Sequence, residues 1–359
     1  MNGKILSFIV CTLMIVSTVV PVSGIVLMEK TSHPLTKGNI LYVGGSGPNN
    51  YTKIQDAIND SSDGDTVYVY DDSSPYYENI MIRKSIVLIG EDKNTTIIDG
   101  RYGKDVTYIK CNNVTISGFT IQHDGETSDW AGIWITGNDC IIEGNIIQKS
   151  DNGILLANGL PNINPRGHRI LNNIIQNNQG MGIISVIGGS NFTISGNVIA
   201  KNGYCGITLS GTINSKNNIV RNIITDNNHY GIWVLGNSNN LTENTVQNHK
   251  IPRLILRLAA GITVQGTDNI ITRNNLINNS RQQAYQKVDG INRTELFNII
   301  KENNVWDENY WGEPLTEPKR IVGRILINAF LNLGFLWLPW TTYDEHPAQE
   351  PYDIPLQDR

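Results

Sequence analysis

A repeated Asn motif limits what this chain can fold into more than any other feature. In each copy, an apolar residue stands three places before an Asn and another stands two places after it. A Gly-Ile pair recurs between the copies, and successive anchors lie 21 to 30 residues apart. The Asn residues are Asn145, Asn173, Asn197, Asn222, Asn244, Asn274 and Asn303. This period indicates a repeat protein in which each copy forms one structural unit.

The segments within each copy are typical of strands. Runs such as Ile133-Trp134-Ile135 and Ile232-Trp233-Val234 are short, rich in β-branched residues, and broken by Asn and Gly. A copy with two or three short strands cannot bury its apolar side chains alone, so the copies must stack. The pattern therefore predicts an all-β parallel β-helix, a solenoid with about 4.8 Å between coils.

The recurring Asn is interpreted as a structural column. Asn tolerates a left-handed backbone better than most residues, and its amide can hydrogen-bond the Asn of the next coil. We expect it where the chain bends between two sheets, and we expect the Gly before Ile to permit a second bend. A ligand site would not need to recur in seven coils.

The N-terminal end of the solenoid should carry a capping helix. An open strand edge invites aggregation, so each end needs a cover. Residues 50–65 place Ile54, Ala57 and Ile58 on one helical face, and a strand is expected at 66–70.

The C-terminal end is expected to carry a capping segment. The stretch after Trp306 leaves the repeat pattern, and Trp306, Tyr310 and Trp311 are expected to close the last coil. The apolar run 321–340 is expected to pack on the solenoid as a cap or strand. Membrane association of this run is the alternative, although it contains Arg324 and other polar residues.

The N-terminus has the order of a secretory signal peptide. One Lys precedes an apolar run that ends at Pro21, Ser23 and Gly24. The predicted organisation is a signal peptide at 1–24, a linker at 25–38, the β-helix at 39–312 and a C-terminal cap or tail at 313–359. We therefore expect an extracellular or cell-surface location, with an uncleaved anchor as the alternative. The three cysteines that follow the signal peptide have no CxxC spacing and predict buried free thiols.

Three sequence features resemble a known group of proteins. They are YTKIQDAINDSSDGDTVYV, KSIVLIGEDKNTTIIDG and the repeated GN-I and GI pairs. Together they resemble the right-handed parallel β-helix repeats of the pectin-lyase-like class, over about 39–312. They are most similar to secreted archaeal and bacterial surface proteins of the NosD-like type. The resemblance implies a right-handed coil, and it implies polysaccharide lyases, glycoside hydrolases or an accessory role in copper-enzyme maturation as activities of the class.

The residues themselves favour neither catalysis nor a metal. The net charge of −5 and the absence of a Lys/Arg-rich block argue against nucleic acid as a partner. The copies that carry the Asn motif, 142–305, contain no two adjacent acidic residues, and the histidines are scattered as expected for solvated surface groups. We therefore predict no catalytic residues, no metal ligands and no cofactor.

An aromatic column provides the candidate site. The residue after each Gly-Ile pair should point outward, and this column runs Trp134, Leu155, Ile184, Thr208, Trp233 and Thr263. The column two places before the Gly contains Trp130, Asp151, Tyr204 and His229, with Tyr230 beside it. One hypothesis is that residues 251–260 or the C-terminal segment cover this surface. The other is that Trp130, Trp134, Tyr204, Tyr230 and Trp233 bind sugar rings, with Asp151 and His229 as hydrogen-bonding groups.

The sequence thus predicts a glycan-binding or cell-envelope structural module without catalysis. Its partner would be a polysaccharide or glycoconjugate, with association with the cell envelope. A polysaccharide lyase or hydrolase of the same fold and a NosD-like copper accessory protein are the alternatives. The sequence does not predict an oligomeric state.

Overall fold

The computed structural model describes residues 38–101, 104–123, 130–157, 165–186, 188–210, 214–250, 260–280, 282–291, 304–328 and 335–355. Within these ranges it contains many short strands and one helix. The expected signal peptide lies outside the described residues, as does the expected linker except for Gly38.

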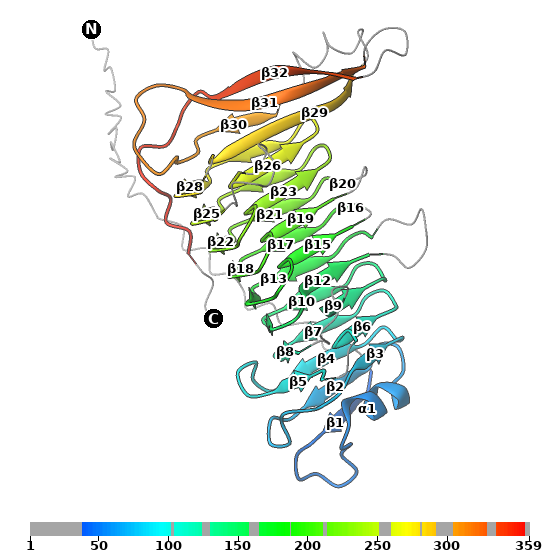
Figure 1. The fold of residues 1–359 in the computed structure, drawn as a ribbon. Coiled ribbons are helices and arrows are strands. Elements are labelled where there is room, and N and C mark those ends of the chain that lie inside the picture. Colours follow the sequence, from blue (N-terminus) through cyan, green and yellow to red (C-terminus); the bar gives the residue numbers. More distant parts are fainter. Residues whose placement is uncertain are drawn as a thin grey trace, which may run out of the picture. The chain divides into compact units, whose positions relative to one another are not determined.

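The strands form three parallel stacks, and the chain passes through the three stacks in turn from β4 to β29 (Figure 1). The first stack consists of β1 (Ile40–Val43), β2 (Thr66–Val69), β4 (Val87–Gly90), β7 (Thr115–Ser117), β10 (Ile141–Glu143), β13 (Arg169–Leu171), β17 (Thr193–Ser195), β21 (Asn218–Val220), β24 (Asn240–Thr242), β27 (Ile270–Thr272) and β30 (Val305–Asp307). The second stack consists of β5 (Ile97–Asp99), β8 (Thr120–Gln122), β11 (Ile146–Gln148), β14 (Ile174–Gln176), β18 (Val198–Ala200), β22 (Ile223–Thr225), β25 (Thr245–Gln247) and β28 (Asn275–Ile277). The third stack consists of β3 (Ile80–Ile82), β6 (Thr107–Ile109), β9 (Ala131–Ile135), β12 (Asn152–Leu156), β15 (Ile183–Ser185), β19 (Ile207–Leu209), β23 (Ile232–Leu235), β26 (Ile262–Gln265) and β29 (Ala284–Ile291).

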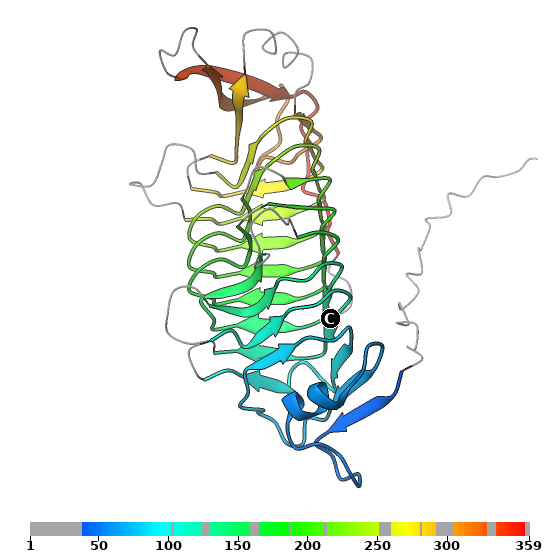
Figure 2. The ribbon, with the colours of Figure 1, turned by 90° about the vertical axis from the view of Figure 1, so that its right-hand side faces the viewer.

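Two further strands, β16 (Gly189–Ser190) and β20 (Asn214–Ser215), pair in parallel beside the stacks. The predicted parallel β-helix is therefore confirmed, with three strands in each of the eight coils between β4 and β29. Figure 2 shows the coils one above another along the axis.

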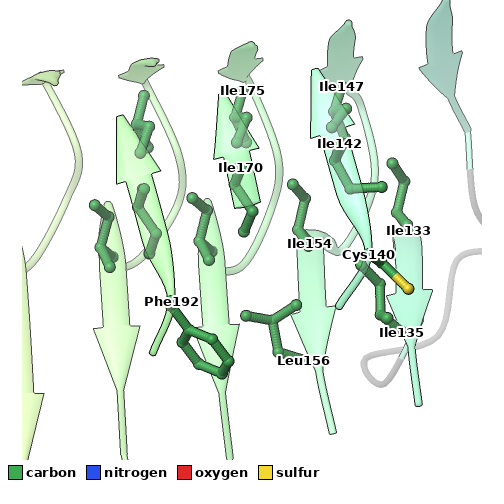
Figure 3. Packing of buried hydrophobic residues seen from close by; sticks show 14 of the residues in the cluster. Ile133, Ile135, Cys140, Ile142, Ile147, Ile154, Leu156, Ile170, Ile175 and Phe192 are labelled. Atoms are coloured by element: carbon green, nitrogen blue, oxygen red, sulfur yellow. The ribbon is translucent and has the colours of Figure 1, made fainter. Parts of the chain in front are cut away.

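The core is a set of apolar columns enclosed by the three stacks. Ile147 and Ile175 from the second stack meet Ile142 and Ile170 from the first (Figure 3), and all four are fully buried. Because alternate residues of a strand point inward, each coil contributes a few apolar side chains, and burial requires the coils above and below.

The corners of the coils share one backbone pattern. A residue with a φ near +55° to +70° precedes a buried residue whose side chain points into the coil, as Asn172 precedes Asn173 and Gly196 precedes Asn197. The left-handed backbone was expected at the recurring Asn itself. It lies instead one residue earlier, where Gly, Asn, Arg and Glu occur.

The recurring Asn residues are hydrogen-bonded from coil to coil. Asn173 donates its backbone N–H to Asn197 Oδ1 at 2.9 Å and its Nδ2 to the same oxygen at 3.1 Å. The same pattern joins Asn145, Asn173, Asn197, Asn222, Asn244 and Asn274. The next position is Asn309, and the column ends on the carboxylate of Asp344. Asn303, expected as its last member, lies outside the described residues.

The two other corners carry buried columns that the sequence reading missed. One column, five residues after the first, contains Asn178, Asn202 and Asn227 and then His249 and Asn279. The other, five residues before it, contains Cys140 and His168 and, in later coils, Asn217, Asn239, Asn269 and Asn304. His168 and His249 are therefore fully buried column members, not the solvated surface groups that we expected.

The Gly-Ile glycines pack tightly. Gly182, Gly206, Gly231 and Gly261 lie at bends, as expected, whereas Gly132 and Gly153 lie within strands. A Cβ on Gly206 would lie 2.4 Å from Ile224 Cγ2 and 2.7 Å from Gly231 O, and Gly182 is similarly enclosed. Their φ values are not left-handed. Gly is required because the next coil and the core leave no space for a side chain.

At the N-terminal end, helix α1 (Ile54–Asp60) buries Ile54, Ala57 and Ile58 against the core, as predicted. It contacts β1, β2 and β3 (Figure 1).

At the other end, β31 (Lys319–Asn328) and β32 (Phe335–Asp344) form an antiparallel hairpin. The hairpin pairs with β29 through β31 and with β30 through Asp344, so it lies on the last strands of the third and first stacks. The apolar run 321–340 thus forms strands. Within the described residues, no helix is long and apolar enough to cross a membrane.

Candidate functional site

The expected outward column of the third stack is aligned strand by strand. Trp134, Leu155, Ile184, Thr208, Trp233 and Thr263 are register partners in consecutive strands. The column continues to Tyr108 on β6 and Tyr285 on β29. Trp134 and Trp233 are four strands apart, which corresponds to about 19 Å along the axis.

The second expected column lies beside the first. Backbone hydrogen bonds connect its members in order: Asn152 N–H to Trp130 O at 3.1 Å, Gly180 N–H to Asp151 O at 2.6 Å, and Tyr204 N–H to Gly180 O at 2.8 Å. His229 N–H then donates to Tyr204 O at 3.0 Å. The structure therefore brings the candidate residues together on one side of the solenoid.

The aromatic residues of this surface form two groups. In the first, the rings of Tyr108 and Trp134 stack with centroids 4.7 Å apart and planes at 15°. Lys110 Nζ lies 4.5 Å from the centroid of Tyr108. One face of each ring is covered by the other ring, so a ligand can use only the opposite face or the edge of Trp134.

The second group surrounds Trp233. The ring of Tyr230 stacks on Trp233 with centroids 5.3 Å apart and planes at 21°. Tyr230 is only 8% exposed and packs with Cys205 and Met181, and burial raises the pKa of its phenol to about 12. Tyr230 therefore packs against one face of the Trp233 ring. It is too buried to make the direct sugar contact that we expected.

Tyr204 and His229 provide the most accessible part of the second group. Tyr204 is 50% exposed, and its ring meets that of His229 edge-on at 4.7 Å. Partial burial lowers the pKa of His229, so its imidazole is neutral at pH 7 and offers one donor and one acceptor.

Asp151 supplies a carboxylate between the two groups. It is partly exposed, and one oxygen accepts a hydrogen bond from Asn152 Nδ2 at 2.9 Å. Sequence reasoning missed Tyr108 and Lys110, because the copy containing β6 has Val106 where later copies have the Gly of the Gly-Ile pair.

One of the two proposed covers of this surface lies elsewhere. Tyr352 N–H donates to Asn275 Oδ1 at 2.8 Å, and Asn275 Nδ2 donates to Tyr352 O at 2.8 Å. Asn275 belongs to β28, so the C-terminal segment up to 355 runs beside the second stack (Figure 1). The other proposed cover, 251–260, lies outside the described residues except for Ala260.

Potential catalytic and metal-binding groups are dispersed. The described ranges contain no group of three or more His, Cys, Asp or Glu arranged to hold a metal ion. Cys111, Cys140 and Cys205 are free, and burial raises their thiol pKa values, so they are poor nucleophiles.

Several solved structures are similar to this chain. The mannuronan C-5 epimerase AlgE4 A-module of Azotobacter vinelandii is 15% identical, with 63% of this chain and 79% of that chain covered and a TM-score of 0.47. Pectate lyase Pel9A is 14% identical, with 71% and 76% covered and a TM-score of 0.49. The Dettilon tailspike protein is 14% identical, with 80% and 72% covered and a TM-score of 0.39. No curated protein matches the sequence.

The family comparison agrees with the observed coil. Residues 106–277 match the family model described as "Right handed beta helix region". This range runs from just before β6 to the end of β28, and it contains most of the candidate site and of the Asn column. The part of the chain that the structure describes is thus an all-β, right-handed parallel β-helix, whose middle segment carries the signature of that family.

Proposed function

We propose that this protein is a glycan-binding module of the cell surface or the extracellular space, and that it acts without catalysis. The observation that carries the proposal is the pair of partly exposed tryptophans in the third-stack column, whose members Thr208, Thr263 and Tyr285 are buried. Trp134 and Trp233 stand four strands apart in one register, each held by a stacked aromatic neighbour. Rings fixed in this way lose little conformational entropy when a ligand binds.

The spacing supports an extended ligand. About 19 Å separates the two tryptophans, and the intervening surface carries the apolar Leu155 and Ile184 beside the carboxylate of Asp151. Sugar rings present both apolar C–H faces and hydroxyl groups, which fits aromatic side chains next to a few polar groups. The proposed ligand is therefore a polysaccharide or glycoconjugate of several sugar units lying along the solenoid axis.

A double substitution tests the proposal. In Trp134→Ala/Trp233→Ala, affinity for any polysaccharide that the parent protein retains in affinity electrophoresis should fall roughly tenfold or more, at about 1 kcal/mol for each aromatic contact. The control is Tyr42→Ala/Tyr77→Ala, which removes two exposed aromatic rings away from the third stack. Unchanged binding by the tryptophan variant would refute the site.

The same polysaccharide panel addresses the enzyme alternative. Release of new chain ends during incubation with the purified protein would favour a lyase or hydrolase over a binding module. The copper-accessory alternative has less support, because His168 and His249 are buried in the corner columns of the solenoid. Retention of copper at neutral pH would restore that alternative.

A further inference from the structure

The C-terminal hairpin leaves the last strand of the first stack largely uncovered. Strand β31 pairs with β29 along several residues, so it covers the end of the third stack (Figure 1). Within the described residues, β32 meets β30 through one pair only, Trp306 and Asp344. An open groove of about 450 Å³ lies beside this pair and is lined by both strands. Its volume falls within the roughly 300 to 1,000 Å³ of ligand-binding pockets.

The groove edge of β32 carries backbone groups that β31 does not use. Opposed residues of an antiparallel pair alternate between hydrogen-bonded and non-hydrogen-bonded positions. Pro339 lies opposite Arg324 and has no N–H, so this pair is not hydrogen-bonded. Because the register is unbroken, Thr341 and Tyr343 also occupy non-hydrogen-bonded positions. Their N–H and C=O groups therefore point away from β31, toward the groove that both residues line.

The side chains of the groove combine apolar surface with negative charge. Val305 of β30 is 49% exposed and Tyr343 of β32 is 44% exposed. Glu345 forms no ion pair within the part of the chain that the structure describes. Asp307 has one ion-pair partner there, His346, whose Nδ1 lies 2.9 Å from Asp307 Oδ1. The groove thus holds two carboxylates against one imidazole.

An extended peptide satisfies both features. An open strand edge is a template for strand addition, in which main-chain hydrogen bonds give affinity and nearby side chains give specificity. Arg320 and Arg324 do not offset the negative charge, because they lie on β31, across β32 from the groove. We propose that the groove between β30 and β32 binds an extended segment of a partner protein, which pairs with the open edge of β32 and places a basic side chain near Glu345.

Fluorescence anisotropy of the full chain with a labelled peptide tests the proposal. The probe is a heptapeptide of alternating valine and lysine, and a matched probe carries glutamate in place of lysine. The lysine peptide should bind saturably and roughly tenfold more tightly than the glutamate peptide, because the groove has an excess of carboxylates. Glu345→Lys should weaken the lysine peptide about fivefold, the upper range for one exposed ion pair. Glu313→Lys makes the same change on an exposed residue outside the groove and should leave binding unchanged.

Changes to the backbone test strand addition itself. Thr341→Pro removes an N–H that faces the groove and spares the ladder with β31, so it should weaken binding about five- to tenfold, as expected for one hydrogen bond. Thr341→Val keeps the backbone donor and should bind the peptide as the parent does. A peptide that is N-methylated at alternate residues lacks the donors of one edge. Of the two such peptides, at least one should lose binding to the parent protein, and this readout does not depend on the folding of a variant.

Three outcomes would overturn the proposal. The first is the absence of saturable binding of the lysine peptide at about 1 mM, an affinity of only about −4 kcal/mol. The second is full binding by both N-methylated peptides, which would show that no strand is added. The third is dimerisation without peptide that Thr341→Pro abolishes, which would identify a second copy as the occupant. None of these outcomes bears on glycan binding, which uses the third stack.

Discussion

Changing Asn197 to Asp tests whether the Asn column stabilises the solenoid through its amide donors. Asn197 Nδ2 donates to Ile170 O at 2.8 Å, Ser195 O at 3.1 Å and Asn222 Oδ1 at 2.9 Å. Its Oδ1 accepts two hydrogen bonds from Asn173. Aspartate has nearly the same shape and keeps the acceptor, so the substitution replaces only the donor group.

The expected cost is large for an isosteric change. Two N–H donors that serve three acceptors are lost, at about 1 kcal/mol for each donor, and placing an oxygen against those acceptors in a fully buried site adds a penalty of about 1 kcal/mol or more. We therefore expect the free energy of unfolding to fall by about 3 kcal/mol or more at pH 7. The new carboxyl would have a raised pKa in the folded state, because it is buried among acceptors. The folded variant then binds a proton more tightly than the unfolded chain, so stability relative to the parent should recover as pH falls.

Asp344→Asn is the control because it makes the opposite change at the end of the same column. Asp344 Oδ2 accepts hydrogen bonds from Asn309 N, Asn309 Nδ2 and Trp311 Nε1 at 3.0 to 3.1 Å. Burial raises the pKa of Asp344. An amide oxygen can accept hydrogen bonds from the same three donors, so the free energy of unfolding should fall by less than about 1 kcal/mol.

Thermal and urea unfolding, followed by circular dichroism at pH 7 and pH 5, measures both variants against the parent. Repeat proteins can unfold in stages, so the transition of each probe should be compared separately. If Asn197→Asp matched the parent within about 0.5 kcal/mol at pH 7, the donor amides would contribute little and the reasoning would be refuted.

Two further predictions concern stability and use the same assay. Gly206→Ala should lower the free energy of unfolding by about 2 to 3 kcal/mol, because its Cβ would overlap Ile224 and Gly231. Gly144→Ala should lower it by only about 1 kcal/mol, since nothing lies within 4 Å of the added Cβ and only the φ of +65° is unfavourable. Equal losses in the two variants would contradict the close-packing explanation. Burial lowers the pKa of His249 to about 4, so its contribution to stability is complete above the ordinary pKa of about 6.5 and decreases as pH falls toward 4. His249→Asn restores the residue found in neighbouring coils and should reduce the loss of stability between pH 7 and pH 5; an unchanged loss would mean that another group causes it.

The fold follows from the sequence because one spatial arrangement satisfies every copy. The Asn and Gly-Ile anchors recur at the coil period, so aligning them predicts which residues become strand neighbours, and Trp134 and Thr208 occupy the expected register. Local rules are harder to infer. The left-handed residue before each recurring Asn is Gly, Asn, Arg or Glu, as at Asn172 and Arg221, so no single residue type marks it.

The candidate site could be predicted only as columns, because contacts within it depend on side-chain packing. Alignment places Tyr230 beside Trp233, yet it does not indicate that Tyr230 is buried beneath that ring. The corner columns show the same limit. His249 can replace an Asn in the column because its ring nitrogens lie near Asn227 O and Ile224 O. From the sequence alone, a histidine at this position is interpreted as a surface residue.

The direction of the Asn column explains why the chain ends its repeats as it does. Between column residues, each Asn donates to the next Asn toward the C-terminus and accepts from the preceding one, as Asn173 does toward Asn197 and from Asn145. A chain of aligned donors needs a terminal acceptor, and Asp344 Oδ2 is that acceptor. Asp344 is the last residue of β32, and its partner Lys319 is the first residue of β31. The residue that terminates the column therefore also fixes the hairpin to the last coil, so the expected loss of the column in Asn197→Asp should propagate toward the hairpin, whereas Asp344→Asn should leave both in place.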